Sequence, residues 1–328
     1  MKLPALLPLA LSLTIGQASA HCSRAELIRF TDRYVAAQRN GSVTALTSLL
    51  GSAFSYTESE VPTPLNASIL NTPLPSIASA RSFHDATSCA TFTELIVPDS
   101  SPSSGPYVIG TRMSFNQNHR ATLIETLATK PGDWLFNATG YAYYNSLEDW
   151  SPIPSGRQDS REVIKAAGDA YFDRFSNTNT TVPFGTPCAR LEGGAYTDTR
   201  NSSVNTCALG LPSTLAVTNR RYVVDEVLGA VVILVGFPGL DRTVEAQPMP
   251  DSHLFRVEGG RIRYIHTLST CVTPGCGMMG GNGTVNIPTM AARRKLVNAG
   301  PWKYQWKREK RVGGGGEEKR KKAVRLTA

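Results

Sequence analysis

The chain has 328 residues, of which 41% are hydrophobic and 18% charged, with a formal net charge of +8. The positive charge is concentrated at the carboxyl end, because residues 291–328 hold 13 Lys and Arg against three acidic residues. Residues 21–290 carry 20 basic and 23 acidic residues, a net charge of −3. A nucleic-acid-binding domain presents a basic face, and this body has no basic excess, so we expect no nucleic-acid partner.

Residues 1–20, "MKLPALLPLALSLTIGQASA", predict a secretory signal peptide. One lysine precedes an apolar run, and Ala18-Ser19-Ala20 fits the small-residue cleavage pattern. No later apolar stretch is long enough to cross a bilayer, and the nearest, "VLGAVVILVGF", has the length of a strand. We therefore expect a secreted, extracellular protein that begins at His21 and has no membrane partner.

Six cysteines follow the expected cleavage site, and an even number in an oxidising compartment predicts three disulfides. From their proximity and the repeat described below, we expect the pairs Cys22–Cys89, Cys188–Cys207 and Cys271–Cys276. Secretion also makes the N-x-[S/T] sequons candidate glycosylation sites: Asn40, Asn66, Asn137, Asn179, Asn201 and Asn282.

No metal site and no cofactor are expected. The cysteines and histidines lack the close spacing of a metal-binding ladder. An amino-terminal His21 resembles the copper-binding start of lytic polysaccharide monooxygenases. However, Cys22 follows at once, a helix is expected from Ser23, and no β-sandwich is predicted, so we set the copper hypothesis aside.

Two amphipathic helices open two similar halves of the chain. "SRAELIRFTDRYVAAQRNG" begins at Ser23 and "SREVIKAAGDAYFDRFSN" at Ser160, an offset of 137 residues. Capping-box patterns mark both starts, Ser23 with Glu26 and Asp159 with Glu162. Further along, "LIETLAT" at 123–129 resembles "YIHTLST" at 264–270. The sequence therefore predicts a tandem repeat of one unit.

Strands are expected after each helix. In the first half the candidates are "ATFTELIV", "PYVIGTRMSF", "ATLIETLAT" and "DWLFNATGYAYY", and in the second "RYVVDEVLGAVVILVGF", "HLFRVEG" and "RIRYIHTLS". The Pro-, Ser- and Gly-rich segment 145–160 is the predicted linker. We predict an α+β fold of two domains, residues 21–150 and 157–290, each a helix packed on a curved antiparallel sheet.

This order of elements resembles the nuclear transport factor 2-like (NTF2-like, SnoaL-like) cone, a superfamily that includes ketosteroid isomerases, scytalone dehydratases and polyketide cyclases. "CATFTELIV", "VPFGTPCARLEGGAYT" and "PDSHLFRVEGGRIRYIHTL" resemble more closely a group of secreted fungal proteins with a domain of unknown function, over about residues 21–280. The fungal group implies no activity. The cone implies a pocket on the concave face of the sheet.

The hairpin "DSHLFRVEGGRIRYIHTL" holds the candidate site. A two-residue Gly259-Gly260 turn predicts that Arg256 lies opposite Arg263 and that His253 lies opposite His266. Two facing arginines require solvent, so the other face, with both histidines, should point inward. That inward face also carries the side chains of Phe255, Tyr264 and Asp251.

We expect this cluster to perform acid–base chemistry on a small, largely apolar molecule, by isomerisation, dehydration or cyclisation. His253 and His266 would exchange protons, Tyr264 would donate a hydrogen bond, and Asp251 would orient an imidazole. Phe255, and Glu125 at the position of His266 in the first half, are candidate substrate contacts. Glu125 is also expected to face inward, and a structural role is the favoured alternative for it. In the alternative hypothesis the histidines are structural, and the protein is a non-catalytic secreted binder or effector.

Two other motifs remain. Arg190 and Glu192 in "CARLEGG", and the charged run from Arg220 to Glu226, are expected to form structural ion pairs, and "LEGG" lacks the context of a phosphate loop. Residues 291–328, with a basic run and four consecutive glycines, are predicted to be a disordered tail, a processed segment or a gene-model artefact.

Overall fold

The computed structural model describes residues 22–98, 105–211, 213–238 and 248–272. The signal peptide, His21, Asn282, Cys276 and the basic tail lie outside these residues, as does the predicted pair Cys271–Cys276. Among the described residues, no helix combines the length and apolarity needed to span a bilayer.

Unit 1 comprises the elements from α1 to α3. They are α1 (Arg24–Asn40), α2 (Thr44–Thr47), β1 (Leu50–Glu58), β2 (Val61–Pro62), the 3-10 turns η1 (Leu65–Ala67) and η2 (Ile69–Asn71), β3 (Ser79–Asp85), β4 (Ala90–Val97), β5 (Tyr107–Phe115), β6 (Ala121–Thr129) and α3 (Ala138–Asn145). The predicted capping box of Ser23 and Glu26 is confirmed at the start of α1. The segment "DWLFNATGYAYY", predicted as a strand, instead ends in α3, which the Asn137 side chain caps.

Unit 2 repeats the plan. It comprises η3 (Ser155–Arg157), α4 (Arg161–Asp173), β7 (Phe184–Glu192), β8 (Ala195–Tyr196), β9 (Thr218–Asp225), β10 (Ala230–Phe237), β11 (Met249–Glu258) and β12 (Arg261–Ser269). The cap of α4 is Ser160 rather than the predicted Asp159, whose side chain accepts a hydrogen bond from the backbone of Gly260 instead.

The two sheets have the same topology. Their orders are β2-β1-β6-β5-β4-β3 and β8-β7-β12-β11-β10-β9. Both sheets are mixed rather than wholly antiparallel as predicted, because β1 runs parallel to β6 and β7 runs parallel to β12. The disulfides Cys22–Cys89 and Cys188–Cys207 confirm two predicted pairs. The fold is thus α+β, with two sheet-rich units of equal topology.

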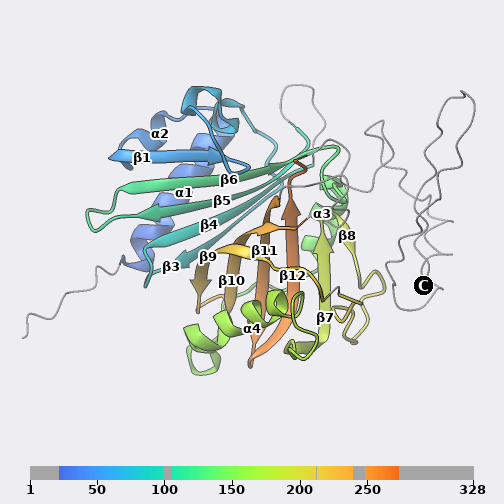
Figure 1. Cartoon of the computed structure of the whole chain (residues 1–328). Helices are drawn as coiled ribbons and strands as arrows, with labels where there is room; N and C mark the ends of the chain where they lie inside the picture. Colours follow the sequence, from blue (N-terminus) through green and yellow to red (C-terminus); the bar gives the residue numbers. More distant parts are fainter. Residues whose placement is uncertain (1–21, 99–104, 212, 239–247, 273–328) are drawn as a thin grey trace, which may run out of the picture.

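The two sheets pack face to face between the long helices. Figure 1 shows α1 against one sheet and α4 against the other. Apolar side chains of both units meet between the sheets in one cluster: Phe83, Phe92, Trp150, Val223, Val232, Leu234 and Leu254. Each unit also keeps a separate core under its own helix, around Tyr34 in unit 1 and Tyr171 in unit 2.

Two reciprocal ion pairs join the units. Arg24 at the start of α1 holds Asp225 at the end of β9, and Arg161 at the start of α4 holds Asp85 at the end of β3. Both aspartates are fully buried, and both arginines bind with two N–O contacts of 2.7–2.9 Å. Because each unit supplies one arginine and one aspartate, the contact has the reciprocity of a symmetric dimer interface within one chain.

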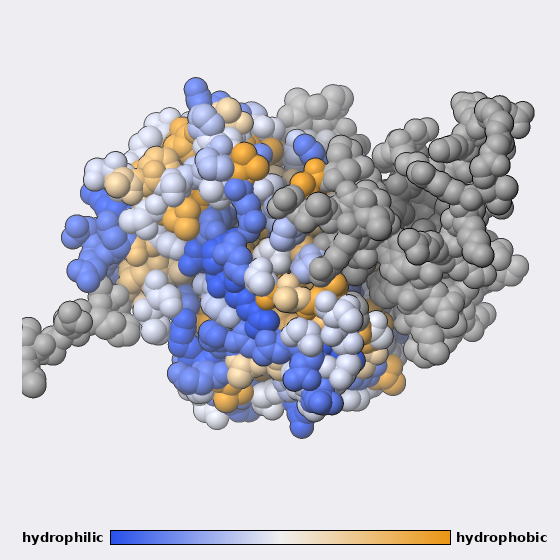
Figure 2. Space-filling model, viewed as in Figure 1, coloured by the Kyte–Doolittle hydropathy of each residue, from blue (hydrophilic) through white to orange (hydrophobic). Residues whose placement is uncertain are grey.

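Further ion pairs line the seam between the units. Arg221 of β9 contacts Glu125 of β6 at 2.6 Å and Glu60 at 2.8 Å, and Arg112 of β5 also contacts Glu125 at 2.6 Å. In the view of Figure 2, hydrophilic residues gather in a band down the middle of the molecule. The predicted inward orientation of Glu125 is therefore wrong, because its carboxylate lies between the units and not under a helix.

Candidate functional site

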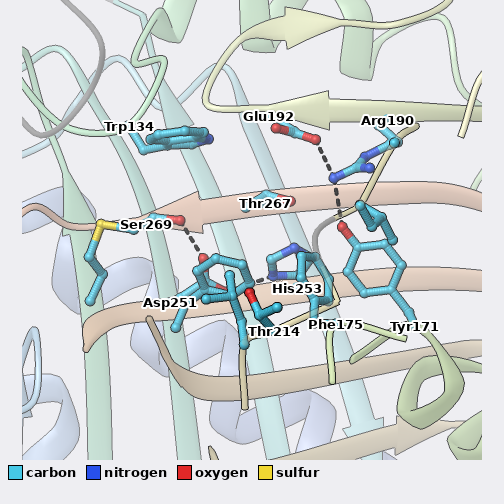
Figure 3. A pocket seen from close by; sticks show the side chains of 15 residues that line it. Trp134, Tyr171, Phe175, Arg190, Glu192, Thr214, Asp251, His253, Thr267 and Ser269 are labelled. Atoms are coloured by element: carbon cyan, nitrogen blue, oxygen red, sulfur yellow. Dashed lines mark hydrogen bonds and ion pairs between the residues drawn. The ribbon is translucent and has the colours of Figure 1, made fainter. Parts of the chain in front are cut away.

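A cavity of about 380 Å3 lies between α4 and the sheet of unit 2. Most of its wall is apolar, and its polar side chains are clustered (Figure 3). The residues that line it are Trp134, Tyr171, Phe175, Arg190, Glu192, Gly210, Leu211, Thr214, Leu215, Phe237, Met249, Asp251, His253, Thr267 and Ser269. A largely apolar pocket with a few convergent polar groups is typical of a small-molecule site.

Asp251 and His253 form a buried dyad on β11. The two residues are separated by one position on the strand, so both side chains project from the same face. His253 Nδ1–H donates to Asp251 Oδ1 at 2.6 Å, and the Ser269 hydroxyl donates to Asp251 Oδ2. Asp251 thereby fixes the tautomer of His253 that leaves Nε2 as the proton acceptor.

The imidazole of His253 is held among aromatic rings. Its centroid lies 5.3 Å from that of Tyr171, 4.9 Å from Phe172 and 6.1 Å from Phe237. Among the described residues, no hydrogen-bond partner contacts Nε2 of His253. The ring is therefore oriented by Asp251 and by packing, while its second nitrogen remains available to a molecule in the cavity.

Tyr171 and Arg190 form the second polar group of the cavity. Arg190 Nη2 donates to the Tyr171 hydroxyl at 2.6 Å and pairs with Glu192 at 2.5 Å, as Figure 3 shows. Arg190 and Glu192 lie on one face of β7 because they are two positions apart. The expected structural ion pair is therefore present, and it lies in the cavity wall. A cationic donor on the phenol oxygen makes Tyr171 a stronger hydrogen-bond donor.

His266 does not lie in the cavity. The turn at Gly259-Gly260 is as predicted, with Glu258 opposite Arg261 and Val257 opposite Ile262, but the next pair is Arg256 with Tyr264. Arg263 is an extra residue in β12, a β-bulge, so every later residue changes face. His253 consequently lies opposite Thr267, and the prediction that it faces His266 is wrong.

His266 instead lies in an interface cluster between the sheets, which we define as Glu94, Tyr141, Glu148, Trp150 and His266. Its Nδ1 donates to Glu94 at 3.1 Å and its Nε2 to Glu148 at 2.5 Å. Tyr141 also donates to Glu94 at 2.7 Å, and Trp150 to Glu148 at 2.9 Å. The cluster thus joins β4, α3, the segment before η3 and β12.

The interface cluster keeps His266 protonated. Burial alone would lower the pKa of His266, but Glu148 and Glu94 outweigh burial and raise it to about 9. Burial likewise opposes ionisation of Glu94, but His266 and Arg81 hold its pKa below the ordinary value. Two carboxylates around one imidazolium describe a structural ion-pair network between units, not a proton acceptor that meets a ligand.

The other predicted site residues divide between these regions. Tyr264 lies on the same side of β12 as His266, where its hydroxyl accepts a hydrogen bond from the backbone of Asp149, so its predicted inward position is wrong. Phe255, a predicted substrate contact, is fully buried with its ring 5.2 Å from Tyr171, and it is not among the residues that line the cavity. Of the four predicted catalytic residues, Asp251 and His253 reach the cavity. Tyr171 is not among the predicted site residues; the available signal was that it corresponds to Tyr34 at the repeat offset of 137 residues.

The described sequons also differ in exposure. Asn40, Asn66, Asn179 and Asn201 are exposed. Asn137 is partly buried, and its side-chain oxygen accepts a hydrogen bond from Gly140 at 2.9 Å. Four of the predicted glycosylation sites are therefore accessible to a glycan, whereas a glycan on Asn137 would compete with the cap of α3.

Comparison with models of protein families finds a similarity over unit 2. A family model described as "Domain of unknown function (DUF8021)" matches residues 157–269. The match begins just before α4 and ends with β12, so it covers unit 2 and every residue of the cavity wall except Trp134. No curated protein matches the chain.

Proposed function

We propose that the protein is a secreted enzyme built from two NTF2-like cones, and that unit 2 performs acid–base chemistry with its own side chains on a small, largely apolar molecule. The reaction would be an isomerisation, dehydration or cyclisation. The observation that carries the proposal is the buried Asp251–His253 dyad in the wall of an apolar cavity. The helix packed on a six-stranded sheet supports the cone fold, and the two disulfides agree with an exported protein.

With a ketone substrate, each of these reactions can start with the removal of a proton from the carbon next to the carbonyl. In the proposed mechanism, His253 Nε2 takes that proton, and Asp251 stabilises the imidazolium that forms. Electrons shift to the carbonyl oxygen, where a hydrogen bond from Tyr171 stabilises the developing negative charge. Arg190, at 2.6 Å from the Tyr171 hydroxyl, strengthens this donor. Tyr171 thus takes the role predicted for Tyr264.

The charges of the cavity favour an uncharged substrate. Arg190 is paired with Glu192 at 2.5 Å, so its charge is compensated. Asp251 is paired with His253 at 2.6 Å, and that dyad is neutral or negative. An anionic substrate would enter a buried site without a net positive charge and lose its hydration there. A ketone with apolar rings or chains fits the remaining wall of Phe175, Phe237 and Met249.

The test uses ketones as probes for proton abstraction. Cyclohexanone, 1-tetralone and a series of 2-alkanones would be incubated with the full chain in D2O, and exchange of the α-protons followed by NMR. We expect catalysed, saturable exchange, and a loss of about 10²-fold or more in His253→Gln, in line with the usual contribution of a general base. Thr111→Val, at the equivalent position of unit 1, is the matched control and should retain the rate.

Two outcomes would reject catalysis. If His253→Gln is folded by circular dichroism and exchanges the probes as fast as the wild type, His253 is not the base. If the wild type binds a probe saturably without accelerating exchange, the cavity belongs to a non-catalytic binder, the alternative that the aromatic packing around His253 also permits.

A further inference from the structure

Among the described residues, Trp134 is the one that unit 1 supplies to the cavity wall. It follows β6 in the connection to α3, yet its indole belongs to the wall of the cavity in unit 2. In Figure 3 the indole lies near Ser269 at one end of the site, and Tyr171 and Arg190 lie at the other end. The site of unit 2 is thus completed by a side chain from outside the segment that the family model matches.

Backbone hydrogen bonds hold this connection against unit 2. Directly before the tryptophan, the carboxylate of Asp133 accepts the backbone N–H of Cys271 at 2.8 Å and that of Lys130 at 2.9 Å. After it, the backbone N–H of Asn137 donates to the carbonyl of Gly193 at 2.6 Å. The indole is therefore carried by a segment anchored on both sides, and it forms a fixed wall of the cavity.

The turn "LEGG" between β7 and β8 makes this contact possible. Gly193 and Gly194 have φ values of 58° and 127°, which favour glycine. A Cβ on Gly193 would lie 2.1 Å from the carbonyl oxygen of Trp134, and one on Gly194 would lie 2.3 Å from that of Asn137. The two glycines allow the backbones of the two units to touch, which accounts for the motif without a phosphate.

We infer that Trp134 determines specificity, so that unit 1 sets the length of the molecule that the cavity of unit 2 accepts. The inference rests on the proposed function only insofar as the cavity binds small apolar molecules, and it requires no catalysis. It also assigns a role to unit 1, whose own interior lacks the dyad: it closes the site of its neighbour.

The experiment measures affinity against chain length. The full chain would be titrated calorimetrically with 2-alkanones of increasing length. Each added methylene should tighten binding roughly fourfold until the cavity is full. In Trp134→Ala the optimum should move to ketones longer by about two carbons or more, since the end wall is removed. Trp134→Phe, whose ring is smaller than the indole, should show a smaller shift of the optimum in the same direction.

Tyr143→Ala is the matched control, because Tyr143 lies in the following helix and is exposed. It should leave the length profile unchanged. If Trp134→Ala does not fold, Trp134→Phe replaces it. A shift of its optimum toward longer ketones then supports the inference, and an unshifted optimum overturns it.

The outcomes separate the two proposals. An unchanged length optimum in a folded Trp134→Ala overturns the inference, even if His253→Gln abolishes exchange. A shifted optimum without any catalysed exchange supports the inference and rejects the enzyme. If neither the wild type nor Trp134→Ala binds any 2-alkanone, the cavity is no apolar ligand site, and the inference is overturned as well.

Discussion

At the position where β11 of unit 2 carries His253, β5 of unit 1 carries Thr111, and where β11 carries Asp251, β5 carries Ile109. The helices above them place a tyrosine over both positions, Tyr34 in unit 1 and Tyr171 in unit 2. In unit 1 the Tyr34 hydroxyl lies 2.7 Å from that of Thr111, which in turn lies 3.0 Å from the Thr126 hydroxyl. One fold therefore holds a chain of neutral hydroxyls in one unit and a dyad of two ionisable side chains in the other.

The space under the helix also differs. In unit 1 it is filled by apolar side chains from the segment around η2, including Ile69, Leu70 and Leu74, which pack with Ile109 in a single core. Gln38 holds that segment by donating to the carbonyl of Ile69 at 2.8 Å. The two units thus share one scaffold, while the residue types on β5 and β11 decide whether the interior of a unit is a core or a site.

The largest predicted effect concerns what the units have in common, the two reciprocal ion pairs. Asp85→Ala and Asp225→Ala should each lower the free energy of unfolding by about 3–5 kcal/mol, because each leaves a partly buried arginine and two backbone N–H groups without the carboxylate that they bind. The aspartates have equivalent partners, since each also accepts two backbone N–H bonds. The two losses, measured by urea unfolding, should therefore agree to within about 1 kcal/mol.

Asp173→Ala is the control, because its carboxylate is half exposed and pairs with Arg220 at the surface. It should cost about 0.5 kcal/mol or less. A loss that is large for one buried aspartate and negligible for the other would show that the interface is not a symmetric one.

The second-largest predicted effect is a pH dependence of stability that comes from His266 in unit 2. The equivalent position in unit 1 is occupied by Glu125. With a folded pKa of about 9 and an ordinary value of 6.5, His266 stabilises the fold fully below pH 6.5. That stabilisation is lost as the pH rises through 9, and it amounts to about 3 kcal/mol. Urea unfolding between pH 6 and 10 should show this decline in the wild type.

His266→Gln should remove the decline and be least stable relative to the wild type at pH 6. The groups that face the ring are Glu94 on β4, Tyr141 on α3, Glu148 and Trp150 before η3, and Arg81 on β3. His119→Gln, at a partly exposed position outside the interface cluster, controls for the loss of a histidine. An equal decline in His266→Gln would mean that another group of the cluster titrates in this window.

The hairpin of β11 and β12 shows which features of the structure could be predicted from the sequence and which could not. The turn type, the pairs next to it and both faces of β11 follow from Gly259-Gly260 and a period of two. The bulge at Arg263 cannot be predicted in this way, because it adds one residue to the strand without a turn motif. A signal did exist: an unbroken register would have placed Arg256 opposite Arg263, and facing like charges are unfavourable. The bulge separates them, and Arg263 donates to the carbonyl of Thr186 instead.

The repeat gives a second indication of that bulge. In unit 1 the register between β5 and β6 also shifts by one, since Ser114 pairs with Leu123 and Phe115 with Ala121, which leaves Thr122 as the extra residue. Thr122 corresponds to Arg263 in the alignment of "LIETLAT" with "YIHTLST".

By contrast, the contacts of Trp134 and Glu148 with unit 2 depend on how the units pack, and no local pattern in the sequence encodes that packing.

The smallest predicted effect tests the interior of unit 1. Thr111→Val removes the hydroxyl between Tyr34 and Thr126 while keeping the volume and β-branching of the side chain. It should lower the free energy of unfolding by about 1–2 kcal/mol, because two buried hydroxyls lose a partner. The rate of ketone exchange should be unchanged, since chemistry is assigned to unit 2 alone. A loss of exchange comparable to that of His253→Gln, in a folded variant, would instead mean that the hydroxyl chain of unit 1 acts on the substrate, and the division of roles between the two interiors would be wrong.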